Sequence, residues 1–407
     1  MPDKPMVSVC ICSYNHARYL PQTIDSVLNQ SFQDFELLIL DDGSTDNSHE
    51  VLSDYQQRYP DKIHYFWHDG HGNRGISYSC NVVLARTRGT YFTWLGSDDY
   101  WLPEKLAIQV KFMAEHPTVG LCHAAAHTMN AAGELFPAIG AQGYISTAAW
   151  RQFIIANPII ASTAIVPRRC FDEIGVFNED LVFSDWDLWI RLAAKYAVAF
   201  LPEPLVAYRV HGQNLSISNQ KAATILAHNL AVIEAATQAL PDLIDADLKC
   251  KSLANVYLRA GLDYFANEQI DEARHSWKQA AQYLNSALPC ESEAVLMGAV
   301  SAYAVHILHA GGWSEASCEQ FIRRVCVNSV PRLEKQTLAH FHVTEAHMSH
   351  VQGRQAEVRH HVAHAIKYHP RQAIDRGLQS IAADALVGPI TAQRLRSTAR
   401  RVRRREV

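Results

Sequence analysis

The segment FELLILDDGSTDNS, residues 35–48, decides the fold. Its first six residues form an apolar run that predicts a buried strand. Asp41 and Asp42 follow this run directly, and Thr45 or Asp46 then caps a predicted helix. A strand that passes through a polar turn into a helix is the repeating unit of α/β domains.

The same alternation of short apolar runs and helical periodicity extends over roughly the first 200 residues. It predicts βα units on a mostly parallel sheet, whose ligands bind at the carboxyl ends of the strands. The predicted strands are Val7–Ser13, Phe35–Leu40, Ile63–Trp67, Thr90–Leu95 and Val119–His123. The predicted helices are Leu20–Gln30, a helix from residue 45 or 46 to about 59, Gly75–Arg88, and one opened by Pro103.

Carboxylate doublets follow two of these strands. Asp41 and Asp42 end the second strand, and Asp98 and Asp99 end the fourth. A helix cap needs one side chain, so capping explains a lone acid such as Asp46 better than it explains a doublet. Hard oxygen ligands suit Mg²⁺ or Mn²⁺ on a nucleotide diphosphate. The first doublet therefore indicates nucleoside recognition, and the second a metal site.

A third acidic cluster opens a predicted helix at Ser184-Asp185-Trp186-Asp187. Asp187 is spaced to pair with Arg191 one helical turn later, and Asp185 near the helix start is a candidate general base. Further along, His211 follows the strand-like run Tyr208-Arg209-Val210. A histidine at a strand end can complete a metal site, although a lone histidine is more often structural.

Together these motifs resemble, in order and spacing, family 2 inverting glycosyltransferases of the GT-A fold. The resemblance covers about residues 5–218. Its motifs are Val7-Ser8-Val9, Ser13-Tyr14-Asn15, Asp41-Asp42-Gly43-Ser44-Thr45-Asp46, Asn73-Arg74-Gly75, Gly96-Ser97-Asp98-Asp99, Ser184-Asp185-Trp186-Asp187-Leu188-Trp189 and Tyr208-Arg209-Val210-His211.

The resemblance implies an enzyme that moves a sugar from a nucleotide-sugar donor, most often a UDP-sugar, to an acceptor hydroxyl with inversion. It implies that Asp185 is the general base and that Asp99 and His211 hold Mn²⁺ or Mg²⁺. Trp186 and Asp187 are acceptor-side candidates. The implied donor-binding residues are Ser13, Asn15, Asp41, Asp42, Asn73, Arg74, Gly75 and Asp98.

Two positions depart from the family pattern. Gly96 replaces the first acid of the metal motif, and Ser184 replaces a glutamate beside the base. Both departures leave the candidate metal and base residues in place. Cys12, at a position where proline is common in the family, is interpreted as a packing residue.

Other motifs favour plainer interpretations. Residues 70–75 match a dinucleotide-binding glycine pattern, but they follow the third strand rather than the first. His360 and His364 have zinc-ligand spacing, but no acid or cysteine completes the set, so a surface helix is expected. Nine cysteines without a Cys-x-x-Cys pair argue against a disulfide framework or a zinc site and favour a reducing cytoplasm.

The second half of the chain is helical in pattern. Residues 220–390 carry a weak repeat of about 40 residues that loosely resembles tetratricopeptide repeats, with an irregular bundle as the alternative. Either architecture predicts a packing module or one that docks a protein partner. Residues 391–407 form a basic tail, interpreted as solvated chain or as an anchor on anionic lipid.

The sequence as a whole predicts a GT-A α/β domain at residues 1–219, with a nucleotide-binding half (about 5–124) and an acceptor half (about 125–219), followed by an all-α domain. The formal charge of −4 disfavours nucleic-acid binding. We expect a cytoplasmic enzyme, peripheral at the inner membrane face, that acts on saccharide or lipid-linked acceptors in cell-surface polysaccharide synthesis. The alternatives are a nucleotidyltransferase and a non-catalytic scaffold built on the helical repeats.

Overall fold

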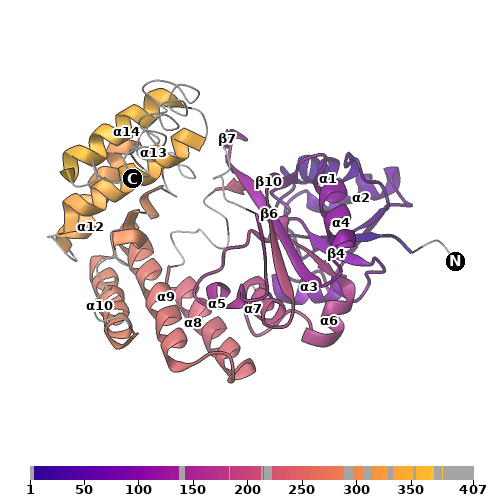
Figure 1. The fold of residues 1–407 in the computed structure, drawn as a ribbon. Coiled ribbons are helices and arrows are strands. Elements are labelled where there is room, and N and C mark those ends of the chain that lie inside the picture. The colour runs from indigo at the N-terminus through magenta and orange to yellow at the C-terminus, as the bar shows by residue number, and fades with distance from the viewer. Residues whose placement is uncertain are drawn as a thin grey trace, which may run out of the picture. The chain divides into compact units, whose positions relative to one another are not determined.

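The chain forms two compact units, Met1–Val256 and Tyr257–Val407 (Figure 1). The first contains the sheet, and the second is helical. The computed structural model describes residues 4–136, 143–182, 184–211, 214, 222–287, 297–301, 303–305, 308, 314–328, 333–351, 354–370 and 378. The basic tail therefore lies outside the described residues.

One mixed sheet organises the first unit. Its order is β3-β2-β1-β4-β9-β6-β10-β5, with β7 paired to β6 and β8 paired to β10. The strands β3, β2, β1 and β4 run parallel, and β9 is antiparallel to both of its neighbours. The strands are β1 (Val7–Ser13), β2 (Phe35–Asp41), β3 (Ile63–Trp67), β4 (Tyr91–Trp94), β5 (Tyr100–Trp101), β6 (Val119–Asn130), β7 (Leu135–Phe136), β8 (Tyr144–Ser146), β9 (Ile165–Pro167) and β10 (Ala197–Val210).

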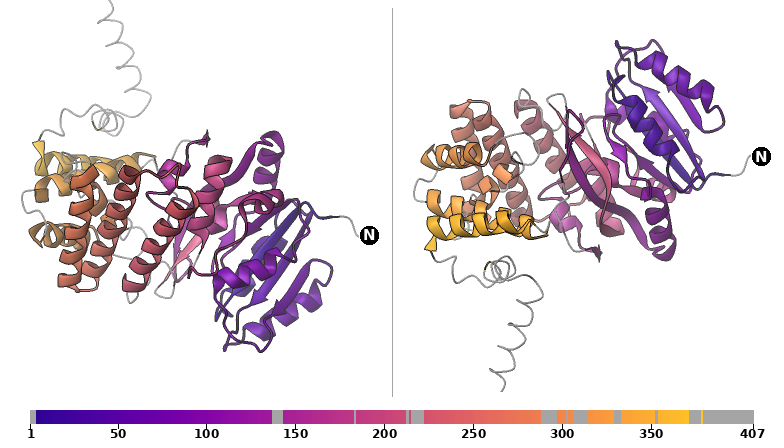
Figure 2. Two further views of the ribbon diagram at one scale, coloured as in Figure 1. Left: turned by 90° about the horizontal axis from the view of Figure 1, so that it is seen from below. Right: turned by 90° about the horizontal axis from the view of Figure 1, so that it is seen from above.

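Helices cover both faces of this sheet (Figure 2). The side chains of α1, α2 and α4 pack in the core on one face, and those of α3, α5, α6 and α7 pack on the other. These helices are α1 (Leu20–Leu28), α2 (Ser48–Arg58), α3 (Ile76–Leu84), α4 (Lys105–Glu115), α5 (Trp150–Phe153), α6 (Arg168–Ile174) and α7 (Asp185–Lys195).

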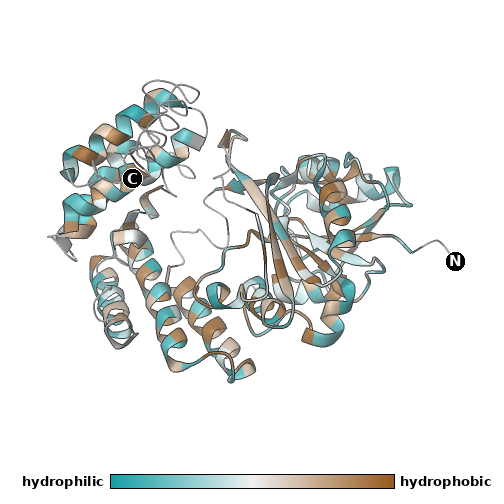
Figure 3. Cartoon of the chain, in the orientation of Figure 1, coloured by the Kyte–Doolittle hydropathy of each residue, from teal (hydrophilic) through white to brown (hydrophobic). Residues whose placement is uncertain are grey.

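The two cores follow from the alternation of side chains along the strands. In β2, Leu37 and Ile39 belong to one core, and Leu38 and Leu40 belong to the other. Every residue of β2 is buried, which explains why its sequence is a continuous apolar run. Figure 3 shows the hydropathy of each residue, with hydrophilic and hydrophobic residues interspersed along the helices.

The predicted elements are largely confirmed. β1 and β3 have the predicted bounds. Helix α2 begins at Ser48 with Asn47 at its N-cap, so the prediction of Thr45 or Asp46 as the cap was wrong, although Asp46 Oδ1 accepts a hydrogen bond from Ser48 N at 3.0 Å. The fifth strand runs past the predicted His123 to Asn130. Strands β9 and β10 were not predicted as full elements.

The first unit extends beyond the α/β pattern. Helix α8 (Ala222–Ala239) contributes Val232 and Ile233 to the core that also contains Leu188 of α7. In α9 (Ala246–Ala266), Asn255 donates a hydrogen bond to the Ile155 carbonyl at 2.9 Å. The domain boundary expected after residue 219 stays a prediction about independent folding.

The second unit consists of helices that pack in neighbouring pairs. The end of α9 packs against α10 at Gly261, where a Cβ atom would lie 2.2 Å from Trp277 Nε1. Helices α13 and α14 likewise contact each other extensively. The remaining helices are α10 (Ile270–Ala287), α12 (Glu315–Asn328), α13 (Glu334–Val351) and α14 (Gln355–Tyr368).

Within the described residues, none of the helices combines the length and the apolar character that a membrane span requires.

Candidate functional site

Three neighbouring strand ends place the first acidic motif at one edge of the sheet. Ser13 at the end of β1 is in register with Asp41 of β2, and Asp41 is in register with Trp67 of β3. These residues therefore lie side by side where parallel strands leave the sheet, the usual ligand-binding edge of such folds. The Ser13 hydroxyl is buried and has no hydrogen-bond partner among the described residues.

A cavity of about 190 Å³ opens at this edge. Trp67, with 41% of its surface exposed, stacks on His71 with ring centroids 4.9 Å apart. Sequence reasoning missed these aromatic residues, although an aromatic run ending at an exposed tryptophan is a usable signal. The cavity is lined by Asp41, Gly43, Ser44, His49, Tyr65, Trp67 and His71.

The loops around this cavity are joined by hydrogen bonds from backbone N–H groups to side-chain oxygens. Asp41 Oδ1 accepts from Ser44 N at 2.9 Å, and Asn15 Oδ1 accepts from Thr45 N at 2.7 Å. Gly43 has a φ of +80°, and a Cβ atom there would lie 2.7 Å from Asn73 N. Only glycine fits this turn without displacing the neighbouring loop.

Asp42 anchors that neighbouring loop. Its two carboxylate oxygens accept hydrogen bonds from Arg74 N at 2.7 Å and Gly75 N at 3.0 Å, and His68 Nε2 lies 3.2 Å from Oδ1. Asp42 is only 4% exposed. The structure therefore gives Asp42 a positioning task, in contrast to the direct nucleoside contact expected from the sequence. The Arg74 guanidinium lies over the Tyr78 ring at 4.7 Å.

A second polar cluster gathers after β4 and β10. Asp98 Oδ2 lies 2.9 Å from His211 Nε2, and His16 belongs to the same group, with one potential ligand atom from each residue within 4.8 Å of the others. His16 Nδ1 is hydrogen-bonded to Ser97 Oγ at 2.8 Å. Burial lowers the pKa of His16, which favours the neutral imidazole that can bind a metal.

Asp99 is buried, and both of its carboxylate oxygens accept hydrogen bonds. Its Oδ2 accepts from Ser162 Oγ at 2.5 Å, and its Oδ1 accepts from Arg209 N at 2.8 Å. Burial, together with the adjacent Asp98 charge, raises the pKa of Asp99 well above its ordinary value. Within the doublet, it is Asp98 that lies beside His16 and His211, and the predicted metal-ligand role of Asp99 stays a prediction.

Gly96 makes room for this doublet. A Cβ atom at position 96 would lie 2.8 Å from Asp99 Oδ2 and 3.0 Å from Asp98 Oδ1. The glycine that replaces the first acid of the motif is therefore matched to the present carboxylate positions.

Asp185 stands at the start of α7 and is half-buried. Burial raises the pKa of its carboxyl to about 6, although hydrogen bonds from the Trp186 backbone and Asn157 act in the opposite direction. Asn157 Nδ2 donates to Asp185 Oδ2 at 3.3 Å. The neighbouring Ser184 is buried and donates to Ser77 Oγ at 2.9 Å. A carboxylate with a pKa near neutrality is suited to accept a proton.

Trp186 and Asp187 point into packed interior. Trp186 is 5% exposed, and its indole N–H donates to the Phe153 carbonyl at 2.6 Å. Asp187 is 3% exposed and forms the predicted ion pair with Arg191 at 2.7 Å. In contrast to the acceptor contact expected from the sequence, neither side chain is open to an acceptor in this arrangement.

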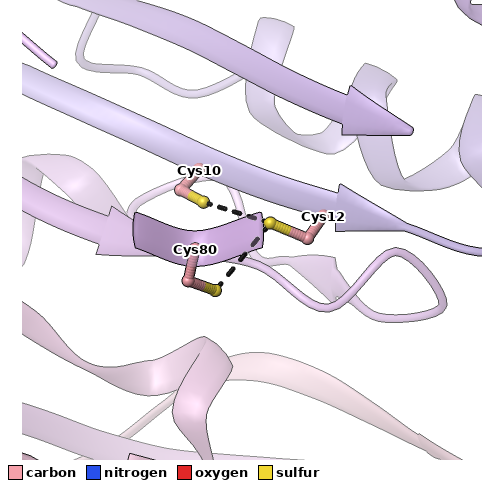
Figure 4. Close-up of side chains that lie close together, drawn as sticks. All are labelled: Cys10, Cys12 and Cys80. Atoms are coloured by element: carbon pink, nitrogen blue, oxygen red, sulfur yellow. Dashed lines mark hydrogen bonds between the residues drawn. The ribbon is translucent and has the colours of Figure 1, made fainter. Parts of the chain in front are cut away.

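Three thiols, those of Cys10, Cys12 and Cys80, lie close together (Figure 4). Cys12 Sγ is 3.8 Å from both Cys10 Sγ and Cys80 Sγ, which is a contact between free thiols and not a disulfide. Cys10 and Cys12 belong to β1 and Cys80 belongs to α3, so the thiol contacts join this strand to this helix. Cys12 packs as expected, although the sequence did not predict its partners.

Comparisons with known proteins identify the family to which the chain is similar. The family model described as glycosyl transferase family 2 matches residues 8–174. A glycosyltransferase of Nostoc sp. is 31% identical over 249 residues, which cover 58% of this chain and 75% of that protein. A glycosyltransferase of Rickettsia typhi is 29% identical over 215 residues, which cover 51% of this chain and 64% of that protein.

Solved structures with a similar chain course are more distant. S. aureus TarS 1–349 is 18% identical, with a TM-score of 0.44 over 68% of this chain and 91% of that one. The mannosyltransferase PcManGT of Pyrobaculum calidifontis, in complex with GDP-Man and Mn²⁺, is 16% identical, with a TM-score of 0.49 over 80% of this chain and 88% of that one.

Proposed function

The chain belongs to glycosyltransferase family 2, with a GT-A core followed by helices, and we propose that it is an inverting, metal-dependent sugar transferase. The observation that carries the proposal is the group formed by His16, Asp98 and His211 at the strand edge that also bears the Asp41 cavity. This edge offers a pocket for a nucleoside and a ligand set for a cation on the diphosphate.

The nucleoside part of the donor is proposed to occupy the cavity beside Asp41. The Trp67 and His71 rings offer stacking surfaces for a base, and carboxylate oxygens can accept from base or ribose donors. Ser13 supplies a buried hydroxyl that no described residue engages. We propose a UDP-sugar as the donor, following the family resemblance.

The residues of the second cluster fit a divalent cation of the Mn²⁺ or Mg²⁺ kind. One carboxylate, Asp98, and two imidazoles, His16 and His211, supply oxygen and nitrogen donors within reach of one another. A bound cation neutralises the charge that develops on the leaving diphosphate. Asp99 is proposed to hold Arg209, and with it the end of β10, in place.

Asp185 is proposed as the general base. Its carboxylate takes the proton from the acceptor hydroxyl while the acceptor oxygen bonds to the anomeric carbon. The bond from that carbon to the diphosphate oxygen breaks, and the electron pair leaves with the nucleotide. The half-buried position supports this assignment, because the loss of solvation raises the carboxyl pKa to about 6. The acceptor is proposed to be a saccharide or a lipid-linked saccharide in cell-surface polysaccharide synthesis.

Calorimetric titration of UDP, GDP and dTDP, with and without Mn²⁺, tests the donor site. We expect one nucleotide to bind wild type only when Mn²⁺ is present, and Asp98→Asn to lose the Mn²⁺-dependent part of that affinity. Asp54→Asn, at an exposed position of α2 paired with Arg58, is the control. Failure of all three nucleotides to bind would overturn the proposal and favour a non-catalytic scaffold.

A further inference from the structure

Helices α12, α13 and α14 of the second unit bring two glutamates and four histidines together. Glu315 and Glu319 are one turn apart on α12, and His360 and His364 are one turn apart on α14. The sequence pattern left this histidine pair without an acid, but the fold supplies two from more than 40 residues away. The six residues are Glu315, Glu319, His342, His360, His361 and His364.

The donor atoms converge on Glu319. Its Oε1 lies 2.9 Å from His342 Nε2 and 3.6 Å from His364 Nδ1, and His364 Nδ1 lies 3.9 Å from Glu315 Oε1. Ligand atoms about 2.1 Å from a tetrahedral ion lie about 3.4 Å from one another. The observed separations bracket that value, so small side-chain adjustments would place all four atoms around one ion.

The cluster is short of positive charge. The His342 and His361 rings are buried beside the two glutamates. Arg323 contacts Glu319 at 3.2 Å but is shared with Glu334. Glu315 contacts His360 Nε2 at 2.9 Å. Two carboxylates beside buried imidazoles are a ligand set that a divalent cation can bind.

Hydrogen bonding alone accounts for only part of this arrangement. His342 Nε2 can donate to Glu319, and His342 Nδ1 can accept from His361 Nδ1, which lies 3.0 Å away. This hydrogen-bonding scheme does not involve His364 Nδ1, a buried nitrogen with no hydrogen-bond partner among the described residues. That nitrogen lies too far from either carboxylate for a hydrogen bond but within the range of a shared ion.

We propose that Glu315, Glu319, His342 and His364 form a binding site for a zinc-class divalent cation in the helical unit. Two imidazoles and two carboxylates are ligands that Zn²⁺ accepts in tetrahedral geometry. His361 lies against His342 and is placed to orient its ring, as outer-shell partners of metal ligands do. The ion joins α12 to both α13 and α14.

Zinc titration of the full chain, with any histidine tag removed and metal stripped by a chelator, tests this site. Competition against a chromophoric chelator should show one tight equivalent in wild type. His364→Gln should weaken it by at least about 100-fold, since losing even outer-shell partners costs 10–100-fold. His347→Gln, an exposed histidine on α13, is the matched control and should bind as wild type does.

Two further variants separate this site from others in the chain. Asp98→Asn and Cys80→Ser should both keep the zinc equivalent, because their side chains belong to the first unit. Cobalt bound in place of zinc should give visible bands without a sulfur-to-cobalt charge-transfer band. Glu315→Gln provides a second test at a less buried ligand. Equal zinc affinity in wild type, His364→Gln and Glu315→Gln, or loss of the equivalent in Cys80→Ser, would overturn the proposal.

Discussion

At the scale of one residue, the ionised Asp185 carboxylate lowers the stability of the folded protein near neutral pH. The carboxyl is half-buried, and the loss of solvation raises its pKa to about 6, above the ordinary range of an aspartate. The folded protein therefore binds this proton more tightly than the unfolded chain does, and the contribution of the group to stability is lost as the pH rises from about 4 to about 6. Near neutral pH the ionised form destabilises the fold.

Asp185→Asn should separate activity from stability. We expect sugar transfer to fall by a factor on the order of 10²–10⁴, the usual contribution of a general base. We also expect the free energy of unfolding near neutral pH to rise by about 1–3 kcal/mol, because two pKa units correspond to about 3 kcal/mol. Urea unfolding measures the second effect. Asp172→Asn, at an exposed carboxylate, should change neither quantity.

The pH profile gives an independent measure of the same group. Because the base must be ionised, kcat/KM should decline as the pH falls below about 6. Initial rates at saturating metal over the acid range test this. A profile that stays flat down to about pH 4.5 would contradict Asp185 as the base.

Gly43 shows the opposite case, in which the residue contributes by having no side chain. Gly43→Ala requires a strained φ of +80° and brings Cβ to 2.7 Å from Asn73 N. We expect a loss of about 1–3 kcal/mol in stability and weaker nucleotide binding as the loop shifts. Gly72→Ala, where a Cβ meets nothing within 4 Å, is the control for thermal unfolding and calorimetry.

At the scale of elements, apolar runs predicted the parallel strands and failed for β10. This strand contains Pro202 and Pro204, which normally argue against a strand interior. Its pairing with β6 shifts register between Leu201 and Val206, so the prolines lie where the ladder is irregular.

The sequence motif identified the doublet Asp98-Asp99, but only the contacts of Ser162 and Arg209 with Asp99 show which of the two acids is buried.

The packing of α4 on the sheet includes a buried lysine that pH can probe. Lys105 Nζ donates to Gln109 Oε1 at 2.7 Å and Thr93 Oγ1 at 3.1 Å, and burial lowers its pKa to about 7. The unfolded chain then binds this proton more tightly, so this group makes the protein more stable as the pH rises above about 7.

Lys105→Met removes that pH dependence. The stability of the variant relative to wild type should fall by about 2 kcal/mol between pH 7 and pH 9, since each unit of pH is worth up to about 1.4 kcal/mol. Urea unfolding at both pH values measures the difference. An unchanged difference would mean that Lys105 keeps its proton in the folded protein up to pH 9, so that its pKa is not lowered. Lys111→Met, on the same helix, is the control.

At the scale of the whole molecule, the first compact unit ends at Val256, whereas the sequence pattern changes from alternating strands and helices to helices alone near residue 220. Val232, Ile233 and Val256 belong to the core of the α/β unit, although their segments look like part of the helical half. The His and Glu cluster was also beyond sequence reasoning, because its acids lie on α12 and its histidines on α13 and α14. Contacts between distant segments, and not local pattern, decide both cases.

Truncation tests where the first unit ends. A fragment of residues 1–266, which keeps α8 and α9 whole, should fold and bind nucleotide with the affinity of the full chain. A fragment of residues 1–219 should be insoluble or unfold at lower temperature, because it exposes the core contacts of α8. Equal stability of the two fragments would place the boundary near residue 219.

The irregular stretch of β10 between Leu201 and Val206 also indicates where related chains can gain or lose a residue. Between Leu201 and Val206 the ladder already contains extra residues, so an inserted or deleted residue there can be absorbed without rotating the regular segment that follows. One residue added between Val206 and His211 would instead turn His211 to the opposite face of the sheet, away from Asp98. Insertions that natural variation tolerates within β10 should therefore fall in its irregular stretch.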